Sequence, residues 1–198
     1  MLSNPYIGEN TGLEVKITTD LVTEPVSVTE QKAYSRFTLA DDDTLIGELI
    51  TSARQRLEAW TGRSFGSKSI IAYWQTFSKE VELPYAPINT ITSVKTIYQG
   101  IETTLVEDTD YYVTGLDLQI LNMVGISQRK WGVTKTSLQV IYIAGYTTLP
   151  KALKEAIMKE VNTAWMNREN YITELRKGGT EPLDNEAKML AQPYKIYL

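Results

Sequence analysis

Two segments with the apolar spacing of an amphipathic helix enclose a long β-rich stretch, and this order restricts the fold most. In residues 44–62 and 149–172 apolar side chains recur every three to four positions, as on one buried helix face. Residues 69–146 between them are rich in β-branched and aromatic side chains. The stripes consist of Leu45, Ile46, Leu49, Ile50, Ala53, Leu57 and Trp60, and of Leu153, Ile157, Val161 and Ala164 or Trp165.

The β-rich stretch contains short strand patterns separated by turn residues. Two of them flank Gln99-Gly100, which predicts a hairpin. Pro84 and Pro87 interrupt residues 81–88 and place them at a sheet edge or in a loop. The sequence therefore predicts an α+β fold. Two long amphipathic helices and a short helix would accompany an inserted antiparallel β-sheet, with an extended N-terminal arm and a C-terminal tail.

Local start and stop residues divide the chain. Residues 1–26 are expected to form an N-terminal arm with one short strand, or a frayed terminus. Ser27 and Glu30 have the spacing of a capping box, so a short helix should begin there. We expect one domain at 27–172, with helices in 27–66, a β region at 67–148 and the second long helix at 149–172. A linker and docking tail would follow at 173–198.

The composition argues against most enzyme classes. The chain has 198 residues, 42% of them hydrophobic and 22% charged, which is an ordinary globular balance. It contains no cysteine and no histidine, so disulfides, thiolate metal sites and histidine general bases are excluded. No catalytic residues, cofactor or metal site are expected. The net charge of −4 also disfavours tight binding to DNA phosphates.

Three consecutive acids, Asp41, Asp42 and Asp43, are the first candidate site. Paired carboxylates can bind Mg²⁺ or Ca²⁺, but the glycine and distal glutamate of a calcium-binding loop are not at their required spacings. Acids at the start of a helix stabilise its dipole, and this reading accounts for the triplet.

The C-terminal PYKIYL sequence is the second candidate site. Pro193, Tyr194, Ile196 and Tyr197 follow a glycine-containing linker, and an exposed apolar tail usually marks a partner site. The alternative is that the tail folds back on its own domain. The first residues show no secretory signal, and no stretch is apolar enough to span a bilayer, so we expect a soluble protein made in a cytoplasm, without a membrane partner.

The order of these segments resembles the phage head-tail connector family of the gp6-like type, also called head-tail adaptors. The similar segments are residues 26–65, with a capped helix, an acidic turn and a long helix ending in Thr-Gly-Arg, and residues 81–100, with Leu-Pro, Pro and Ser-Val. The DYYV run at 110–113, the strand, Ala-Gly-Tyr and proline-opened helix of 140–169, and the ending at 189–197 also match. Together they cover most of residues 26–169 and the tail.

The resemblance implies a structural virion protein and no enzyme. Such subunits form a ring, commonly a dodecamer, below the portal of the capsid. The ring extends the channel for double-stranded DNA, which passes without specific binding, and joins the capsid to the next neck or tail protein. In such a ring Asp41, Asp42 and Asp43 are candidates for the channel-facing surface. The implied partners are other copies of the chain, the portal and that neck or tail protein. The implied location is the head-tail interface of the virion, after synthesis in the bacterial host cytoplasm.

Three alternatives stay open at this point, one of them a carboxylate-dependent nuclease. A head-closure or tail-completion protein would act one step further along the neck. A single-stranded nucleic-acid binding module would use aromatic side chains of the sheet to stack bases, although the strands offer only isolated lysines.

Overall fold

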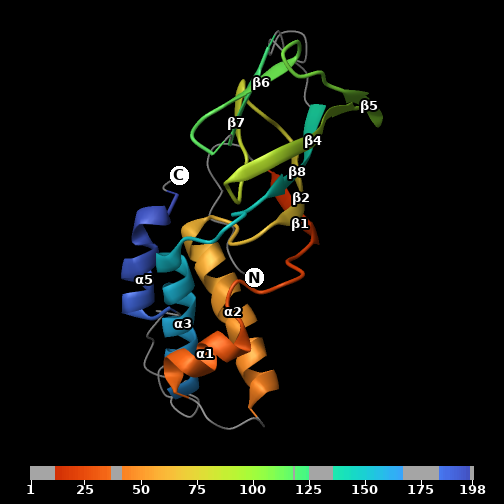
Figure 1. Ribbon diagram of the computed structural model, residues 1–198. Coiled ribbons are helices and arrows are strands. Elements are labelled where there is room, and N and C mark those ends of the chain that lie inside the picture. Colours follow the sequence, from red (N-terminus) through yellow and green to blue (C-terminus); the bar gives the residue numbers. More distant parts are fainter. Residues whose placement is uncertain (1–11, 37–41, 118, 125–135, 167–182, 197–198) are drawn as a thin grey trace, which may run out of the picture. The chain divides into compact units, whose positions relative to one another are not determined.

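The computed structural model describes residues 12–36, 42–117, 119–124, 136–166 and 183–196 (Figure 1). Their elements are mixed α and β, and every pairing between named strands is antiparallel. The α+β class and the antiparallel sheet are thereby confirmed. The chain divides into two compact units. The described part of the sheet unit comprises residues 12–21, 62–117, 119–124 and 136–147, and that of the helical unit comprises residues 22–36, 42–61, 148–166 and 183–196.

The sheet unit contains two antiparallel sheets. The five-stranded sheet has the order β1-β2-β8-β4-β5, and the three-stranded sheet has the order β3-β7-β6. The strands span β1 (Leu13–Thr19), β2 (Lys68–Trp74), β3 (Glu80–Glu82), β4 (Ile88–Tyr98), β5 (Ile101–Thr104), β6 (Tyr111–Thr114), β7 (Ile120–Met123) and β8 (Thr136–Ala144).

Alternation along the strands builds one core from both sheets. In β2 every second side chain, from Lys68 to Trp74, is buried, as expected when one face of a strand is covered. Ile70, Ala72 and Trp74 belong to a core cluster that Val81 and Leu121 join from the three-stranded sheet. The Tyr142 hydroxyl in this core donates a hydrogen bond of 2.9 Å to the Pro84 carbonyl, which satisfies its polar end.

Two local sequence predictions in the sheet unit are confirmed. Strands β4 and β5 form a hairpin whose turn residues Gln99 and Gly100 both have positive φ, at 49° and 82°. Such angles match the right-handed twist of the two strands. Pro84 and Pro87 lie in the irregular segment between β3 and β4, outside both strands. This placement follows because proline cannot donate a backbone hydrogen bond within a sheet.

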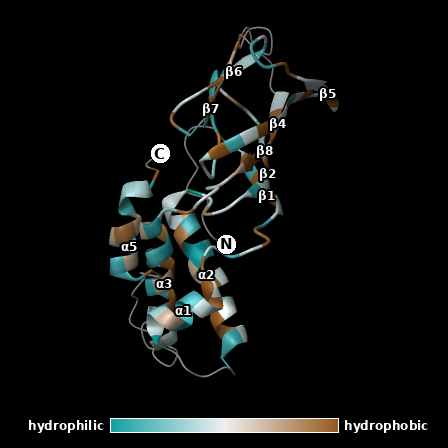
Figure 2. Cartoon of the chain, viewed as in Figure 1, coloured by the Kyte–Doolittle hydropathy of each residue, from teal (hydrophilic) through white to brown (hydrophobic). Residues whose placement is uncertain are grey.

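The helical unit contains α1 (Val28–Ser35), α2 (Asp43–Thr61), α3 (Lys151–Met166), α5 (Asn185–Ala191) and a short 3₁₀ helix, η1 (Gln192–Tyr194). The predicted capping box is confirmed, since the Ser27 hydroxyl accepts from the Glu30 N–H and the Glu30 carboxylate accepts from the Ser27 N–H. The hydropathy colouring in Figure 2 shows brown, apolar positions recurring along the helices. The buried positions include Ile46, Ile50, Ala53, Leu57, Leu153, Ile157 and Val161.

Candidate assembly surfaces

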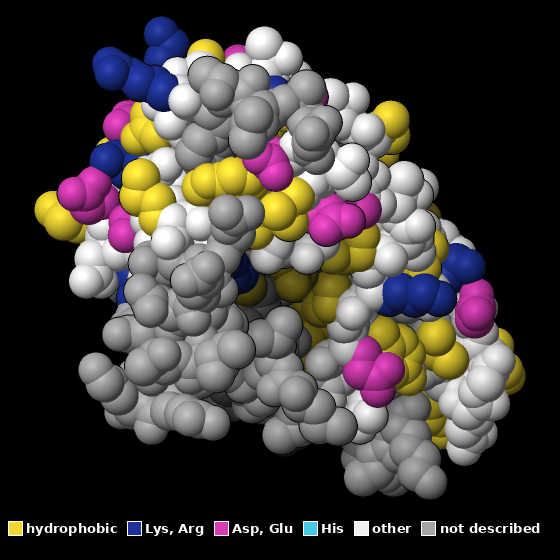
Figure 3. Space-filling view, turned by 90° about the horizontal axis from the view of Figure 1, so that it is seen from below, with side chains coloured by type: hydrophobic (Ala, Val, Ile, Leu, Met, Phe, Trp, Pro, Cys, Tyr) yellow, Lys and Arg dark blue, Asp and Glu magenta, His cyan; other side chains and the backbone are white. Residues whose placement is uncertain are grey.

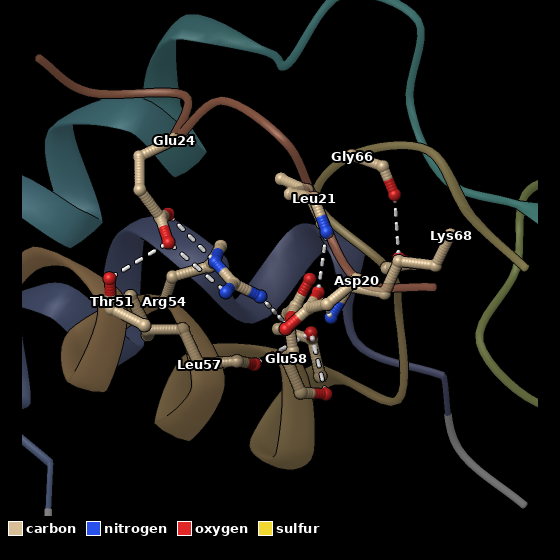
Figure 4. A network of polar contacts seen from close by, with 11 residues as sticks. Asp20, Leu21, Glu24, Thr51, Arg54, Leu57, Glu58, Gly66 and Lys68 are labelled. Carbon is tan, nitrogen blue, oxygen red and sulfur yellow. Dashed lines mark hydrogen bonds and ion pairs between the residues drawn. The ribbon is translucent and has the colours of Figure 1, made fainter. Parts of the chain in front are cut away.

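Arg54 of α2 is fully buried in the helical unit between two carboxylates. Its Nε lies 2.8 Å from Glu24 Oε2, and its Nη1 lies 2.8 Å from Glu58 Oε2 (Figure 4). Thr51 adds a hydrogen bond to Glu24 from the preceding turn of α2. Because these carboxylates satisfy the guanidinium, the network fixes the segment before α1 against α2. We assign it a structural role.

The acidic triplet lies at the start of α2, in the helical unit. Asp43 is the first residue of α2, and its Oδ1 lies 2.6 Å from Lys32 Nζ of α1. The Asp42 carbonyl accepts the first helical hydrogen bond, from Ile46. Asp41 lies outside the described residues. The described acids therefore begin a helix, and one of them pairs with α1. Their exposure to a DNA channel stays a prediction.

The C-terminal candidate residues lie at the other end of α2. Pro193 and Tyr194 are in η1, and the Ile196 N–H donates a hydrogen bond of 2.9 Å to the Thr61 carbonyl, the last residue of α2. Lys195 Nζ lies 4.4 Å from the centroid of the Trp60 ring. Residues up to 196 therefore fold back on their own unit. Tyr197 lies outside the described residues.

The two predicted sites are consequently separate surfaces. Helix α2 has 19 residues, and at about 1.5 Å per residue its two ends lie roughly 27 Å apart. A single partner would have to cover a distance of this size to contact both the acidic residues and the C-terminal residues. The sequence alone did not predict this separation. The position of the C-terminal residues beside the end of α2 depends on the path of the chain through α3 and α5, which no local pattern reveals.

The side chain of Glu160 connects helix α5 to α2 and α3 in the helical unit. The sequence pattern did not identify this residue. The Glu160 side chain is buried, and its Oε1 lies 2.8 Å from Arg56 Nη1 of α2. Its Oε2 accepts from the backbone N–H of Asp184, the N-cap of α5, at 2.8 Å. Burial raises the pKa of the Glu160 carboxyl, while the Asp184 N–H and the Arg56 guanidinium oppose that rise.

Exposed apolar side chains gather in the sheet unit near the β4–β5 hairpin and the β6–β7 pair. Strand β5 is exposed at every residue. Isolated exposed apolar residues are ordinary, and those in or next to edge strands are candidates for contact with another chain. The members of this group are Tyr98, Ile101, Val106, Tyr112, Leu116 and Val124.

The described structure gives little support to a nucleic-acid surface. Trp74, Tyr111 and Tyr142, three of the sheet aromatics, are buried in the core and cannot stack bases. Many basic side chains pair with carboxylates of their own unit, including those of Arg63 and Lys95. On the face seen in Figure 3, blue basic side chains stand singly or in small groups beside magenta acidic ones.

Other site classes receive no support from the described part of the chain. Its acidic residues form no group of three or more that could hold a metal ion. None of its helices combines the length and the apolar character needed to cross a bilayer.

The fold is similar to that of chains in gene transfer agent (GTA) particles. One solved structure, the neck of an empty GTA particle computed with C6 symmetry, aligns with a TM-score of 0.67 at 16% identity. A chain in the virion of a native GTA particle gives the same values, and both alignments cover 93% of this chain and 96% of the other. The neck of a native GTA particle computed with C12 symmetry aligns at 0.60 with 14% identity, covering 92% and 96%. No protein-family model and no curated protein matches the chain.

Proposed function

We propose that this chain is a structural subunit of the neck of a phage-like particle and performs no catalysis. The observation that carries the proposal is the fold shared along nearly the whole length of both chains with GTA neck components, at a TM-score of 0.67. The resemblance of the sequence to head-tail adaptors points to the same role independently of the fold. Fold alone does not define function, so the proposal rests on the agreement of the two.

In the finer form of the proposal, copies of the chain form a ring, a dodecamer, on the portal below the capsid. The C6 and C12 symmetries of the similar necks support a ring of this kind. The ring would extend the channel for double-stranded DNA and offer a surface to the next neck or tail protein. A net charge of −4 suits a channel wall that lets DNA slide. The acids Asp41, Asp42 and Asp43 are our candidates for that wall.

The residues proposed to contact the portal or a neighbour are Pro193, Tyr194, Ile196 and Tyr197. Deleting everything after Gly179 would be a poor test, because Leu183, Ala187 and Ala191 are buried in the helical unit. Tyr194→Ala combined with Ile196→Glu leaves the backbone bond from Ile196 to Thr61 intact and changes only side chains. The double variant should stay folded and lose attachment to portal-bearing heads. Unchanged attachment would remove the tail from the proposal.

The direct test is to mix the purified protein with DNA-filled heads that carry a portal and to image the vertices. We expect a ring on each portal vertex, with a mass that gives the copy number. A protein that stays solitary in the presence of such heads would contradict the proposal. The head-closure alternative predicts attachment only after an adaptor ring is in place. A salt-dependent gel shift with single-stranded DNA would favour the nucleic-acid alternative.

A further inference from the structure

Strand β1 lies at one end of the five-stranded sheet and pairs, among the described strands, only with β2. The Gly12 carbonyl accepts a hydrogen bond of 3.2 Å from the Gln75 N–H, so the backbone groups of Gly12 and of every second residue after it face β2. The N–H and C=O groups of the residues between them point away from β2, toward the edge of the sheet. These edge-facing residues are Leu13, Val15 and Ile17. Such groups can accept a further strand.

The side chains of β1 alternate between the two faces of the sheet. Its apolar side chains share the core face, because they lie opposite residues of β2 that are buried in the core. Glu14 and Lys16 lie on the outer face and are exposed, and neither has an ion pair with another described residue. Ile17 is 40% exposed although it is on the core face. The opposed pairs are Leu13–Trp74, Val15–Ala72 and Ile17–Ile70.

The sequence Leu13-Glu14-Val15-Lys16-Ile17 is complementary to itself about its central residue. A second copy, related by a two-fold axis that passes beside Val15 perpendicular to the sheet, would present its β1 in the antiparallel direction. Val15 then lies opposite Val15 of the second copy, Glu14 opposite Lys16, and Leu13 opposite Ile17. A two-fold axis in this direction keeps the core faces of both sheets on the same side. Opposite charges therefore meet on the outer face, and apolar side chains meet on the core face.

The backbone groups of β1 fit the same register. Antiparallel strands exchange N–H···O bonds only at every second pair, so edge-facing residues must lie opposite edge-facing residues. The two-fold arrangement meets this condition, since Leu13, Val15 and Ile17 all lie opposite members of their own set. A shift by one residue would break it and would place core-side residues opposite outer ones. A shift by two would place Glu14 opposite Glu14, or Lys16 opposite Lys16, which is unfavourable.

Two features of β1 favour a second copy of the chain over a foreign strand. A lysine and a bulge usually protect an edge strand, but here the register with β2 shifts only after Ile17, the last residue that the pairing uses. Lys16 is favourable opposite Glu14 of a second copy and unfavourable opposite an apolar or basic residue. Strand β5, at the other end of the sheet, contains no base to pair with its own Glu102, which already contacts Lys95.

We propose that two copies of the free protein form a dimer through β1, with one continuous sheet across the two-fold axis. This contact is isologous, whereas a single ring whose copies all face the same way contains only heterologous contacts. The β1 contact therefore cannot form between members of one ring. The dimer is a state of the free protein, and it opens when copies enter the ring. This last step rests on the proposed function, and the dimer itself does not.

Charge reversal tests the contact in solution, with sedimentation of the full chain over a series of concentrations. The natural chain should be a dimer that dissociates on dilution. Lys16→Glu puts acids opposite each other at both ends of the contact and should raise the dissociation constant roughly threefold to thirtyfold, as for the loss of two exposed pairs. Adding Glu14→Lys in the same chain should restore the dimer, because the exchanged charges again meet their opposites.

The control for this experiment is Lys151→Glu, the same change of charge at an exposed position of the helical unit, which should leave the dissociation constant unchanged. A natural chain that stays monomeric at every concentration would overturn the inference. A chain with both exchanged charges that dimerises no better than Lys16→Glu alone would overturn it as well.

Engineered cysteines test the register, and the natural chain contributes no cysteine of its own. Glu14 of one copy and Lys16 of the other form a non-hydrogen-bonded pair, with Cα atoms about 4.5 Å apart and within disulfide range. Two copies of the same residue lie on the diagonal, about 7–8 Å apart. A mixture of Glu14→Cys and Lys16→Cys should therefore cross-link under mild oxidation, and each variant alone much less. Equal cross-linking in all three samples, or none in the mixture, would overturn the register.

The cross-linked dimer also separates this inference from the proposed function. Mixed with portal-bearing heads, it should form no ring, and reduction of the disulfide should restore ring formation. Rings built from cross-linked dimers would overturn the opening step. If the natural chain dimerises through β1 but neither it nor the reduced variants form a ring on the heads, the proposed function fails while the dimer stands.

Discussion

Glu160 of α3 accepts a hydrogen bond of 2.8 Å from the backbone N–H of Asp184, the residue that caps α5. The other oxygen of the same carboxylate pairs with Arg56 of α2. One buried side chain thereby connects three helices, and Asp184 in turn accepts from the N–H groups of Glu186 and Ala187. The attachment of α5, and of the residues up to Ile196 that follow it, depends on this carboxylate.

Removing this connection should loosen α5. Glu160→Ala leaves the Asp184 N–H and the Arg56 guanidinium without their acceptor, so the free energy of unfolding should fall by about 1–3 kcal/mol. Glu160→Gln retains an acceptor for Asp184 and should cost less. Urea unfolding measures both values, and amide exchange at Ala187 and Ala191 reports on α5 directly. Equal stability of both variants and the natural chain would contradict the role of Glu160.

The pKa of Glu160 predicts how this contribution changes with pH. Burial raises its folded-state pKa above the ordinary 4.5, so the native state binds the proton more tightly than the unfolded chain. The free energy of unfolding should therefore fall as the pH rises from 4.5 through the raised pKa. Glu160→Gln has no such carboxyl. Its stability relative to the natural chain should improve over the same pH range, as measured by thermal unfolding in a series of buffers.

Glu30 should show the opposite dependence. The hydrogen bond from Lys154, followed by those from Ser27, lowers the pKa of this carboxyl to about 2. Its stabilising effect is present above pH 4.5 and is lost as the pH falls toward 2. Glu30→Gln should therefore be less stable than the natural chain at neutral pH and nearly equal to it near pH 2. Because the side chain is half exposed, the difference should be small and should shrink in salt.

Arg54→Met should be among the most damaging single changes in the helical unit. It removes the Arg54 guanidinium from the buried Glu58 carboxylate, and breaking a buried ion pair costs up to about 3–5 kcal/mol. Arg54→Met combined with Glu58→Leu should recover part of that loss, since the buried Glu58 carboxylate is then absent and only the partly exposed Glu24 loses its contact with the guanidinium. Lys151→Met, an exposed change of the same kind in α3, is the control and should have little effect. Chemical unfolding of all three variants separates these outcomes.

Two glycines with positive φ give a matched pair for backbone crowding. At Gly145, with φ of 123°, an added Cβ would collide with the backbone carbonyl of Gly66, whereas at Gly100, with φ of 82°, it would meet nothing within 4 Å. Gly100→Ala should cost only the strain of the angle, about 1 kcal/mol. Gly145→Ala should cost clearly more, because backbone atoms must move. Similar melting temperatures for the two variants would show that the sheet adjusts freely.

Local patterns predicted local structure well. The capping box at Ser27 and the turn at Gln99-Gly100 involve residues close in sequence, so side-chain chemistry and backbone preference suffice to identify them. The apolar stripes overlap α2 and α3 for the same reason, although residues 167–172 of the predicted second helix lie outside the described residues. Pro84 and Pro87 lie outside the neighbouring strands, as expected because proline has no backbone N–H to donate within a sheet.

Sequence patterns did not predict which segments far apart in the chain would pair with each other. Strand β1 was expected only as a short strand in an arm, yet it pairs with β2 more than fifty positions later in the chain. Arg54 and Glu160 are buried through partners on other segments, Glu24 and Asp184, that no periodic pattern connects to them. That β5 is the last strand of its sheet among the described residues became visible only once the strand order was known. Periodicity reports which face of an element is covered, but not what covers it.

The division of the chain into two units has a mechanical consequence. The backbone passes from one unit to the other near residues 21, 61 and 147, because each unit is assembled from separate stretches of sequence. A single cut by a protease at one crossing would leave the units covalently joined by the others. Tension applied across the two units would likewise be divided among several backbone connections instead of falling on one peptide link.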